Sequence, residues 1–177
     1  MSTLNSPFLQ LIQNLAPTSL QQSVWEALQD KHWYFGNQSN EGQAGVPFWK
    51  MDLDASAPVT QLWQHCKPFC EQKTGRALRV VRQYANGHTY GQGGQPHRDD
   101  MREGTYTLLY YPMPEWRGEW EGETMFLGDN HEVIAAVRPQ PNRAVLFDSR
   151  ILHYGKAPAR SYSGLRITVA FKLEPAQ

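Results

Sequence analysis

The first third of the chain carries apolar residues at helical spacing. Ser6-Pro7 has the form of a helix cap followed by proline, and a first helical face is then predicted from Phe8, Leu11, Ile12 and Leu15. Thr18 and Gln21 have the spacing of a capping box. They predict a second helix, which ends near Asp30 and carries an apolar stripe of Leu20, Val24 and Leu28.

A third helix is predicted from Pro58 to about Lys73. Its stop is Thr74-Gly75, and Pro68 is expected to kink or divide it. Its inward face would carry Val59, Leu62, Trp63, Cys66 and Cys70. Between the second and third helices, the polar, glycine-bearing segment Gly36–Gly45 is predicted to be a loop.

The pattern then changes to short runs of β-branched and aromatic residues, separated by Gly, Pro, Asn and Asp. Strands are predicted near Phe48–Leu53, Leu78–Tyr84, Thr105–Tyr111, Glu123–Leu127, Val133–Val137, Ala144–Asp148, Ile151–Tyr154 and Arg166–Leu173. This spacing favours a mainly β sandwich or jelly roll with the N-terminal helices packed on one outer face. We expect a single domain over residues 1–177, with helical support over about 1–75 and a β core over about 76–173.

Composition and charge narrow the classes of function. The 177 residues fall within the range of one domain, and no apolar run approaches the length of a membrane span. Seventeen basic residues balance 17 acidic ones, so bulk charge gives no support to a nucleic-acid partner. The first residues lack the basic and apolar regions of a secretory signal, and we expect a cytoplasmic protein of unspecified oligomeric state.

Cys66 and Cys70, with His65 beside them, offer a possible structural zinc site. Such a site needs four tetrahedral ligands, and the sequence shows no fourth nearby. We therefore favour the alternative, in which both thiols pack on the apolar face of the helix.

The strongest chemical signal is Pro96-His97-Arg98-Asp99. In an extended chain alternate side chains share a face, so His97 and Asp99 can converge on one metal ion, although such a pair also occurs as a surface hydrogen bond. His153 follows an apolar strand pattern, where it is either a neutral core histidine or a third ligand. Two histidines and a carboxylate leave three octahedral positions open, which suits iron(II); zinc hydrolysis would also need a base that no further motif supplies.

Two arginines are candidates to bind a carboxylate ligand with a bidentate fork. Arg166 opens a strand and shares its face with Thr168, whereas Arg160 lies in an apparent loop. The alternative for Arg166 is a salt bridge at the rim. Tyr111 could add a hydrogen bond to the same carboxylate, or Tyr110 could if the strand register differs by one.

Together these motifs resemble the iron(II)- and 2-oxoglutarate-dependent dioxygenases, in particular the prolyl 4-hydroxylase-like branch. The matching segments run in the family's order between about residues 78 and 173, and they are His97-Arg98-Asp99, Tyr110-Tyr111-Pro112, Trp120–Phe126, Pro141–Asp148, His153, and Arg166 before Thr168. The resemblance implies a double-stranded β-helix, the cupin-like form of the jelly roll. It also implies that His97, Asp99 and His153 hold iron(II), that Arg166 binds the distal carboxylate of 2-oxoglutarate with Tyr111 and Thr168 beside it, and that Tyr84 lines the co-substrate pocket.

The implied reaction is hydroxylation of a C–H bond in a peptide, amino acid or other small substrate, with O₂ consumed and succinate and CO₂ released. Ascorbate is a candidate reductant. Related halogenases replace the carboxylate ligand with a small residue, so Asp99 favours hydroxylation. Two departures from the family pattern matter. Arg166 stands further from His153 than the basic residue usually does in prolyl hydroxylases, so a longer loop must be accommodated. Gly91–Gly94 replaces a shorter connection that in the family approaches the substrate, which puts a proline substrate in question.

Two other functions stay open at this point. One is oxidative dealkylation of nucleic acids, because Arg160 and Arg166 have that group's Arg-x5-Arg spacing. The other is a β-barrel without catalytic activity that binds a metal or small ligand. The neutral charge and the glutamates between Glu119 and Glu123 weigh against a phosphate-rich partner.

Overall fold

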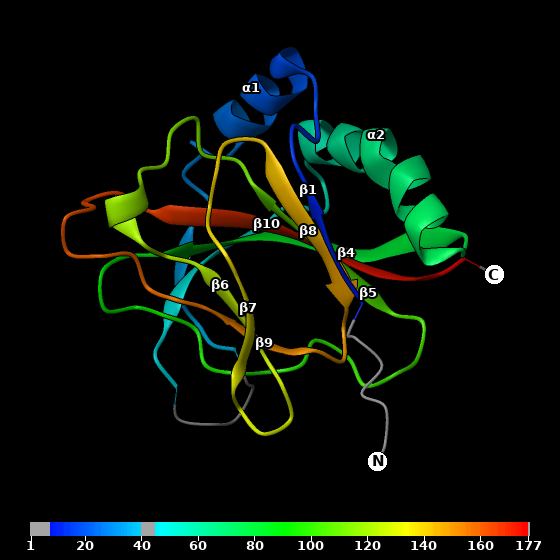
Figure 1. Cartoon of the computed structure of the whole chain (residues 1–177). Helices are drawn as coiled ribbons and strands as arrows, with labels where there is room; N and C mark the ends of the chain where they lie inside the picture. The colour runs from blue at the N-terminus through cyan, green and yellow to red at the C-terminus, as the bar shows by residue number, and fades with distance from the viewer. Residues whose placement is uncertain (1–7, 40–44, 177) are drawn as a thin grey trace.

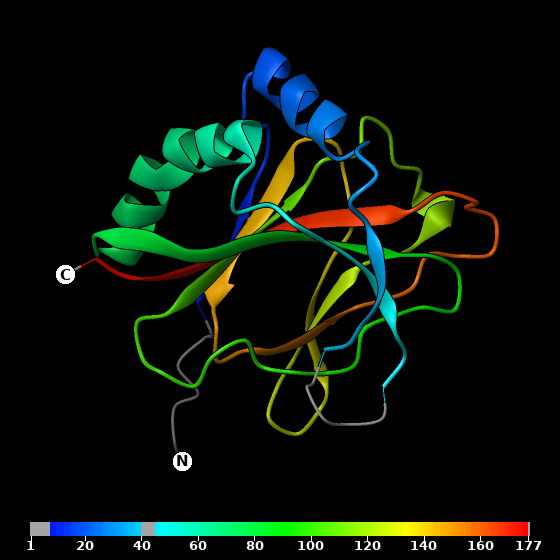
Figure 2. The ribbon, with the colours of Figure 1, turned by 180° about the vertical axis from the view of Figure 1, so that it is seen from behind.

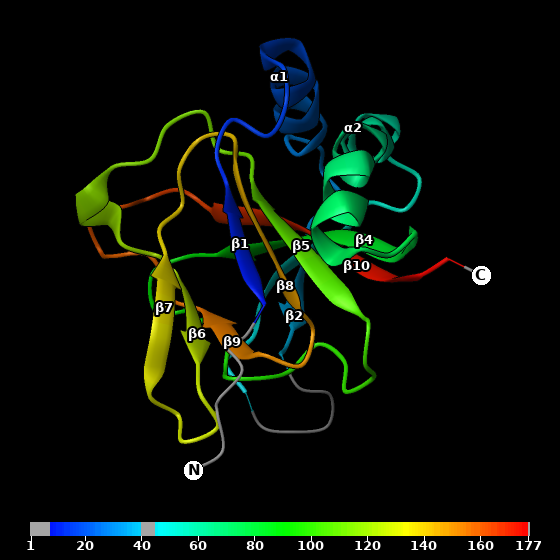
Figure 3. The ribbon, with the colours of Figure 1, turned by 45° about the vertical axis from the view of Figure 1, so that its right-hand side comes forward.

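The computed structural model describes residues 8–39 and 45–176. This part of the chain forms two antiparallel sheets, which Figures 1 and 3 show beside each other. The seven-stranded sheet has the order β1 (Leu9–Ile12), β8 (Arg143–Asp148), β5 (Tyr106–Tyr111), β10 (Arg166–Pro175), β4 (Leu78–His88), β3 (Phe48–Asp52) and β2 (Tyr34–Asn37). The three-stranded sheet has the order β7 (Val133–Val137), β6 (Thr124–Leu127) and β9 (Leu152–Gly155).

Helices α1 (Thr18–Ala27) and α2 (Ala57–Thr74) lie together on one side of the large sheet (Figures 1 and 2). Strand β10 shows how the two faces of that sheet differ. Phe171 packs on Trp63 of α2, with ring centroids 6.1 Å apart, and belongs to the apolar core with Ile167, Val169 and Leu173. The alternate positions of β10 are Arg166, Thr168, Ala170 and Lys172, so the opposite face carries most of the polar groups.

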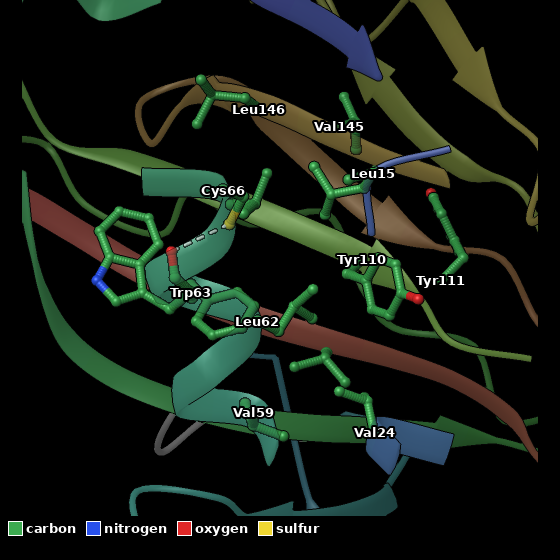
Figure 4. Packing of buried hydrophobic residues seen from close by; sticks show 14 of the residues in the cluster. Leu15, Val24, Val59, Leu62, Trp63, Cys66, Tyr110, Tyr111, Val145 and Leu146 are labelled. Carbon is green, nitrogen blue, oxygen red and sulfur yellow. Dashed lines mark hydrogen bonds between the residues drawn. The ribbon is translucent and has the colours of Figure 1, made fainter. Parts of the chain in front are cut away.

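The core beneath the helices contains both cysteines. Figure 4 shows Cys66 among the apolar side chains of this core. Cys66 and Cys70 are buried, and the Cys66 thiol donates to the carbonyl oxygen of Trp63 at 3.5 Å. The hydrogen bond with Cys70 and burial raise the pKa of the Cys66 thiol well above its ordinary value. His65 is exposed, so the thiols act as small apolar groups and the alternative of a zinc site is not supported.

The architecture confirms the predicted fold class, a double-stranded β-helix with helices on one outer face. Gly75 ends α2 in the left-handed conformation at φ 67°, as predicted, and its N–H donates to Glu71. Division of α2 at Pro68 was a wrong prediction, because the helix continues through this exposed residue. Burial of four of its apolar side chains, Val59, Leu62, Cys66 and Cys70, holds the helix together on both sides of the proline.

The predicted first helix is a strand. Leu9 pairs with Phe147 and Ile12 with Ala144, so β1 covers the edge of β8. An unpaired strand edge leaves backbone N–H and C=O groups without partners, and this long-range pairing outweighs the helical spacing of the local apolar residues. The predicted cap Ser6-Pro7 lies outside the described residues.

Two further details of the N-terminal third differ from the prediction. Helix α1 begins at Thr18 with Pro17 as its cap residue and without a side-chain cap bond, so no capping box forms. The segment predicted as a loop from Gly36 begins inside β2, which pairs with β3, while residues 40–44 lie outside the described chain. Neither α1 nor α2 has the length and apolar character that a membrane-crossing helix requires.

Candidate active site

Backbone pairing brings the two predicted histidine ligands together. His97, in the segment after β4, forms an isolated antiparallel bridge with His153 of β9. The His97 N–H donates to the His153 carbonyl at 3.0 Å, and the reciprocal bond is 2.9 Å. The rings consequently face each other with centroids 4.5 Å apart. Asp99 is fixed two residues later, because its N–H donates to the Ser149 carbonyl at 3.0 Å.

The hydrogen bonds of both imidazoles leave one nitrogen available for a metal. Nδ1 of His97 lies 2.8 Å from the Gln95 carbonyl oxygen, and Nδ1 of His153 lies 2.8 Å from that of Ile151. A carbonyl only accepts, so Nδ1 carries the proton and Nε2 keeps its lone pair. Metal-binding histidines usually make this outward bond, which fixes the tautomer and the ring orientation.

Asp99 is the third candidate ligand, and its carboxylate lies close to the Nε2 atoms of both histidines. Its Oδ1 lies 3.4 Å from Nε2 of His97, and its Oδ2 lies 3.5 Å from Nε2 of His153. The Thr107 hydroxyl donates to Oδ2 at 2.6 Å, and the Lys172 ammonium contacts the same oxygen. The two outer donors thus occupy one carboxylate oxygen and leave Oδ1 for an ion.

Electrostatics keep these groups in the protonation states that a metal needs. Burial lowers the pKa of His153 to about 4, against the attraction of Asp99, so the ring is neutral at physiological pH. Burial opposes ionisation of Asp99, but the charge of Lys172, the largest opposing cause, helps to outweigh it, and the pKa of the carboxyl lies well below its usual range. Burial likewise opposes the charge on Lys172, but Asp99 raises the pKa of the ammonium above its ordinary value.

These donors fit a divalent metal. The candidate ligand atoms of His97, Asp99 and His153 all lie within 4.8 Å of one another, the only such group of three found among the described residues. Two neutral imidazole nitrogens and one carboxylate oxygen, on one side of an ion, form the facial triad of non-haem iron(II) oxygenases. Phe126 and Phe147 pack around His153, with ring centroids 5.9 and 4.7 Å away, and shield this side from water.

A cavity of about 890 Å³ opens beside the triad. Its walls include His97 and Asp99, and the inward face of β4 supplies every second residue from Arg82 through Tyr84 and Asn86 to His88. Tyr84 therefore lines this cavity. Its ring lies within 6 Å of the cationic groups of Lys50, Arg82 and Lys172, at 5.2, 4.6 and 5.7 Å.

The other expected co-substrate residues form a buried cluster next to the cavity. Arg166 donates from Nε to the Gly122 carbonyl at 2.6 Å and from Nη2 to Thr124 Oγ1 at 3.0 Å. The Tyr111 hydroxyl donates to the same Thr124 oxygen at 2.7 Å. Thr168 is buried on the Arg166 side of β10, and none of Arg166, Tyr111 and Thr168 lines the cavity.

The strand register decides between the two tyrosines. The Arg166 guanidinium lies 6.0 Å from the Tyr111 ring, whereas the Tyr110 hydroxyl points to Asn142 at 3.3 Å. Arg160 is exposed in the loop after β9, whereas Arg166 is buried in the cluster with Tyr111 and Thr124, so the two arginines of the Arg-x5-Arg spacing are not brought to one site.

The two departures from the prolyl hydroxylase pattern have structural explanations. The loop between β9 and β10 packs Tyr162 against Trp116 and Trp120, with both centroid distances 4.7 Å, and so accommodates the longer connection to Arg166. The glycine-rich segment lies against the end of β9. A Cβ on Gly93 would be 3.0 Å from the Ala157 nitrogen, so a side chain here would press on the backbone that follows β9.

Sequence reasoning missed His88 and Lys172. Both could have been found from strand periodicity, since Lys172 lies six residues after Arg166 and His88 four after Tyr84, each at an even spacing on the same face. The signal was hidden because the predicted β4 ended at Tyr84, whereas the strand continues to His88.

Comparison with known proteins identifies the family. A family model described as the 2OG-Fe(II) oxygenase superfamily matches residues 81–171, which contain all three candidate ligands and Arg166. The chain belongs to the 2OG-Fe(II) oxygenase superfamily. It is therefore an oxygenase that depends on iron(II) and 2-oxoglutarate, and the family expected from its motifs is confirmed. No curated protein sequence matches the chain.

Solved structures share the fold of this oxygenase at low sequence identity. A prolyl hydroxylase from Trichoplax adhaerens, in complex with a hypoxia inducible factor peptide, has a TM-score of 0.67 at 18% identity over 97% of this chain and 86% of its own. HygX from Streptomyces hygroscopicus, with nickel, 2-oxoglutarate and hygromycin B, has a TM-score of 0.72 at 13% identity, over 97% and 84%.

The epimerase SnoN from nogalamycin biosynthesis, in complex with Fe³⁺, alpha ketoglutarate and nogalamycin RO, has a TM-score of 0.72 at 12% identity, over 96% of this chain and 80% of its own. At these identities the likeness shows the fold alone.

Proposed function

We propose that the protein hydroxylates a C–H bond of a peptide, amino acid or other small substrate. The observation that carries this proposal is that the candidate ligand atoms of His97, Asp99 and His153 lie within 4.8 Å of one another, with His97 and Asp99 in the wall of the cavity. Overall, one O₂ and one 2-oxoglutarate convert the C–H bond to C–OH and yield succinate and CO₂. Iron(II), when bound, supplies the activation of oxygen, and the residues supply position and charge.

Each ligand has a defined role in this proposal. His97 and His153 hold the metal through Nε2, while their Nδ1–H bonds to backbone carbonyls fix the rings. Asp99 holds it through Oδ1, and its carboxylate occupies the position that a halide would need. This arrangement supports hydroxylation over halogenation.

The co-substrate is proposed to bind between the triad and Arg166. Arg166 keeps two N–H groups beyond its three described bonds, one on each terminal nitrogen, and these can form a bidentate pair with the distal carboxylate. Tyr111 supports the guanidinium through Thr124, and Thr168 packs on the same face. Tyr84 closes the side of the cavity.

The dealkylase alternative loses its structural basis. Its Arg-x5-Arg spacing would need Arg160 at the site, but this side chain is exposed in the loop after β9, whereas Arg166 is buried. We therefore propose a peptide or small molecule, and not a nucleic acid, as the substrate class.

Formation of succinate and CO₂ from 2-oxoglutarate tests the proposed reaction. The protein is assayed with iron(II), ascorbate, O₂ and a panel of peptides and amino acids. We expect succinate formation to increase when the substrate is present. Asp99→Ala should abolish turnover because the metal loses its only anionic ligand, whereas Asp30→Ala, at an exposed aspartate beyond α1, should not change it. Full succinate production by Asp99→Ala would reject the triad.

A further inference from the structure

Two buried polar atoms beside the metal centre have no hydrogen-bond partner among the described residues. They are Oδ1 of Asn86 and Nε2 of His88. Both residues lie on β4, two positions apart, and both line the cavity. Buried polar groups in native proteins are nearly always paired, so unpaired atoms on residues that line a cavity favour a ligand beside them.

The free atom of His88 is a hydrogen-bond donor. Its Nδ1 lies 3.2 Å from Nη1 of Arg166, and a guanidinium only donates, so Nδ1 accepts and the proton sits on Nε2. Burial, together with the nearby charge of Arg166, holds the pKa of His88 well below its ordinary value and keeps the ring neutral. The site thus presents an N–H that needs an acceptor, whereas the free atom of Asn86 is itself an acceptor.

The charge beside His88 specifies what kind of acceptor is needed. Arg166 is almost completely buried, and no ion pair of its guanidinium with a carboxylate is found among the described residues. Glu123, whose charge acts on Arg166, pairs with Arg138 and Lys156 instead. A buried cation without a paired counter-charge is unfavourable, so the site favours an anionic ligand. A carboxylate meets both demands, because it is negatively charged and can accept from several donors at once.

The surroundings hold both donors in place. The His88 ring packs on Phe48 with centroids 4.7 Å apart. A Cβ on Gly155 would lie 3.1 Å from Cε1 of His88 and 3.3 Å from Nη1 of Arg166, so glycine at this position leaves the pair room. His88 and Arg166 also face each other across the β4–β10 register.

We propose that Nε2–H of His88 donates a hydrogen bond to the distal carboxylate of 2-oxoglutarate, as a second co-substrate donor beside Arg166. This inference rests on the proposed function, in which Arg166 binds that carboxylate. His88 thereby contributes to selection of a dicarboxylic 2-oxo acid, because a co-substrate without the distal carboxylate leaves both donors unsatisfied.

Binding measurements on the iron(II)-loaded protein under anaerobic conditions test the assignment. His88→Phe keeps a ring of similar size and removes the donor, and we expect 2-oxoglutarate to bind about ten- to a hundredfold more weakly. His88→Gln keeps a side-chain N–H and should recover part of that loss. The iron(II) affinity of both variants should match that of the unchanged protein, because His88 does not contact the triad.

An unchanged affinity of His88→Phe for 2-oxoglutarate would overturn the inference. Arg166→Ala, measured in parallel, separates this outcome from failure of the proposed function. If Arg166→Ala also binds 2-oxoglutarate normally, or if the unchanged protein does not bind it, the assignment of 2-oxoglutarate to this site is wrong. If His88→Phe does not fold, the inference is tested by a nuclear magnetic resonance measurement on the unchanged protein. In zinc-loaded protein labelled with ¹⁵N-histidine, the Nε2–H signal of His88 should shift when 2-oxoglutarate binds, and an unmoved signal at saturation would overturn the inference.

Discussion

One oxygen of the Asp99 carboxylate is engaged by Thr107 and Lys172, while the other is left to the metal. This division matters because a ligand that is already oriented loses less conformational freedom when it binds. Lys172 also offsets the negative charge of the buried carboxylate. The order of the iron site therefore depends on residues that would not themselves touch iron.

Thr107→Val tests this support. The change keeps the shape of the side chain and removes the hydroxyl that donates to Asp99 at 2.6 Å. We expect iron(II) affinity, measured by anaerobic titration, to fall about tenfold or more. Thr18→Val, the same change at an exposed residue of α1, should bind iron(II) normally. Equal affinity of the two variants would show that the Thr107 hydroxyl does not support the ligand.

Arg166 and Arg160 offer a matched pair for the co-substrate. Charge-assisted hydrogen bonds contribute roughly 1.5–3 kcal/mol, so Arg166→Ala should weaken 2-oxoglutarate binding by about ten- to a hundredfold. Arg160→Ala should bind as before, because this side chain is exposed in the loop after β9, whereas Arg166 is buried beside the cavity. Calorimetric titration of the iron(II)-loaded variants checks both. An equal loss of 2-oxoglutarate affinity in Arg160→Ala would instead support a site that contains both arginines.

At the scale of elements, the two-residue period of β-strands is the pattern from which residues on a common face could be predicted. Period two placed His97 with Asp99 and Arg166 with Thr168, because these relations are local. The contact of His97 and Asp99 with His153 depends on a backbone bridge between segments that are distant in sequence. No local pattern encodes such a bridge. The family resemblance supplied that connection. The same limit explains the error at β1, whose strand pairing with β8 is also long-range.

Asn142 fixes the chain between β1 and α1. Its side chain accepts from the Ala16 N–H at 2.9 Å and donates to the Ala16 carbonyl at 2.7 Å, while its backbone adopts φ 57°. Asn142→Ala should lower the free energy of unfolding by about 2–4 kcal/mol, because three buried side-chain hydrogen bonds are lost, that from the Tyr110 hydroxyl included, and alanine is strained at positive φ.

Urea unfolding of the purified variants measures this change. Asn142→Gly separates the two causes, since glycine accepts the backbone angle but still lacks the side-chain bonds, and it should lie between the alanine variant and the unchanged protein. An alanine variant as stable as the unchanged protein would mean that this junction does not hold β1.

At the scale of the whole molecule, folding buries two histidines in neutral form. The pKa of His153 is lowered to about 4 and that of His88 lies well below its ordinary value, in both cases chiefly through burial. In the unfolded chain both would titrate near pH 6.5, so between that pH and the folded values the unfolded state binds more protons. Their contribution to stability is complete above about pH 6.5 and is lost as the pH falls.

The metal-free protein should therefore lose stability in mild acid. His153 alone predicts a decrease on the order of 2 kcal/mol in the free energy of unfolding between about pH 7.5 and pH 5. Urea unfolding in the presence of a chelator measures it. His65→Ala, at an exposed histidine, should show the same pH dependence. A free energy of unfolding that does not change over this interval would contradict neutral burial of these rings.

The most direct test of the central claim is an anaerobic calorimetric titration of the iron(II)-loaded protein with 2-oxoglutarate. If His97, Asp99 and His153 hold the metal that the co-substrate chelates, binding should saturate at one 2-oxoglutarate per chain and require iron(II). It should disappear in Asp99→Ala and persist in Asp30→Ala. Absence of binding by the loaded protein, or equal binding by Asp99→Ala, would contradict the account.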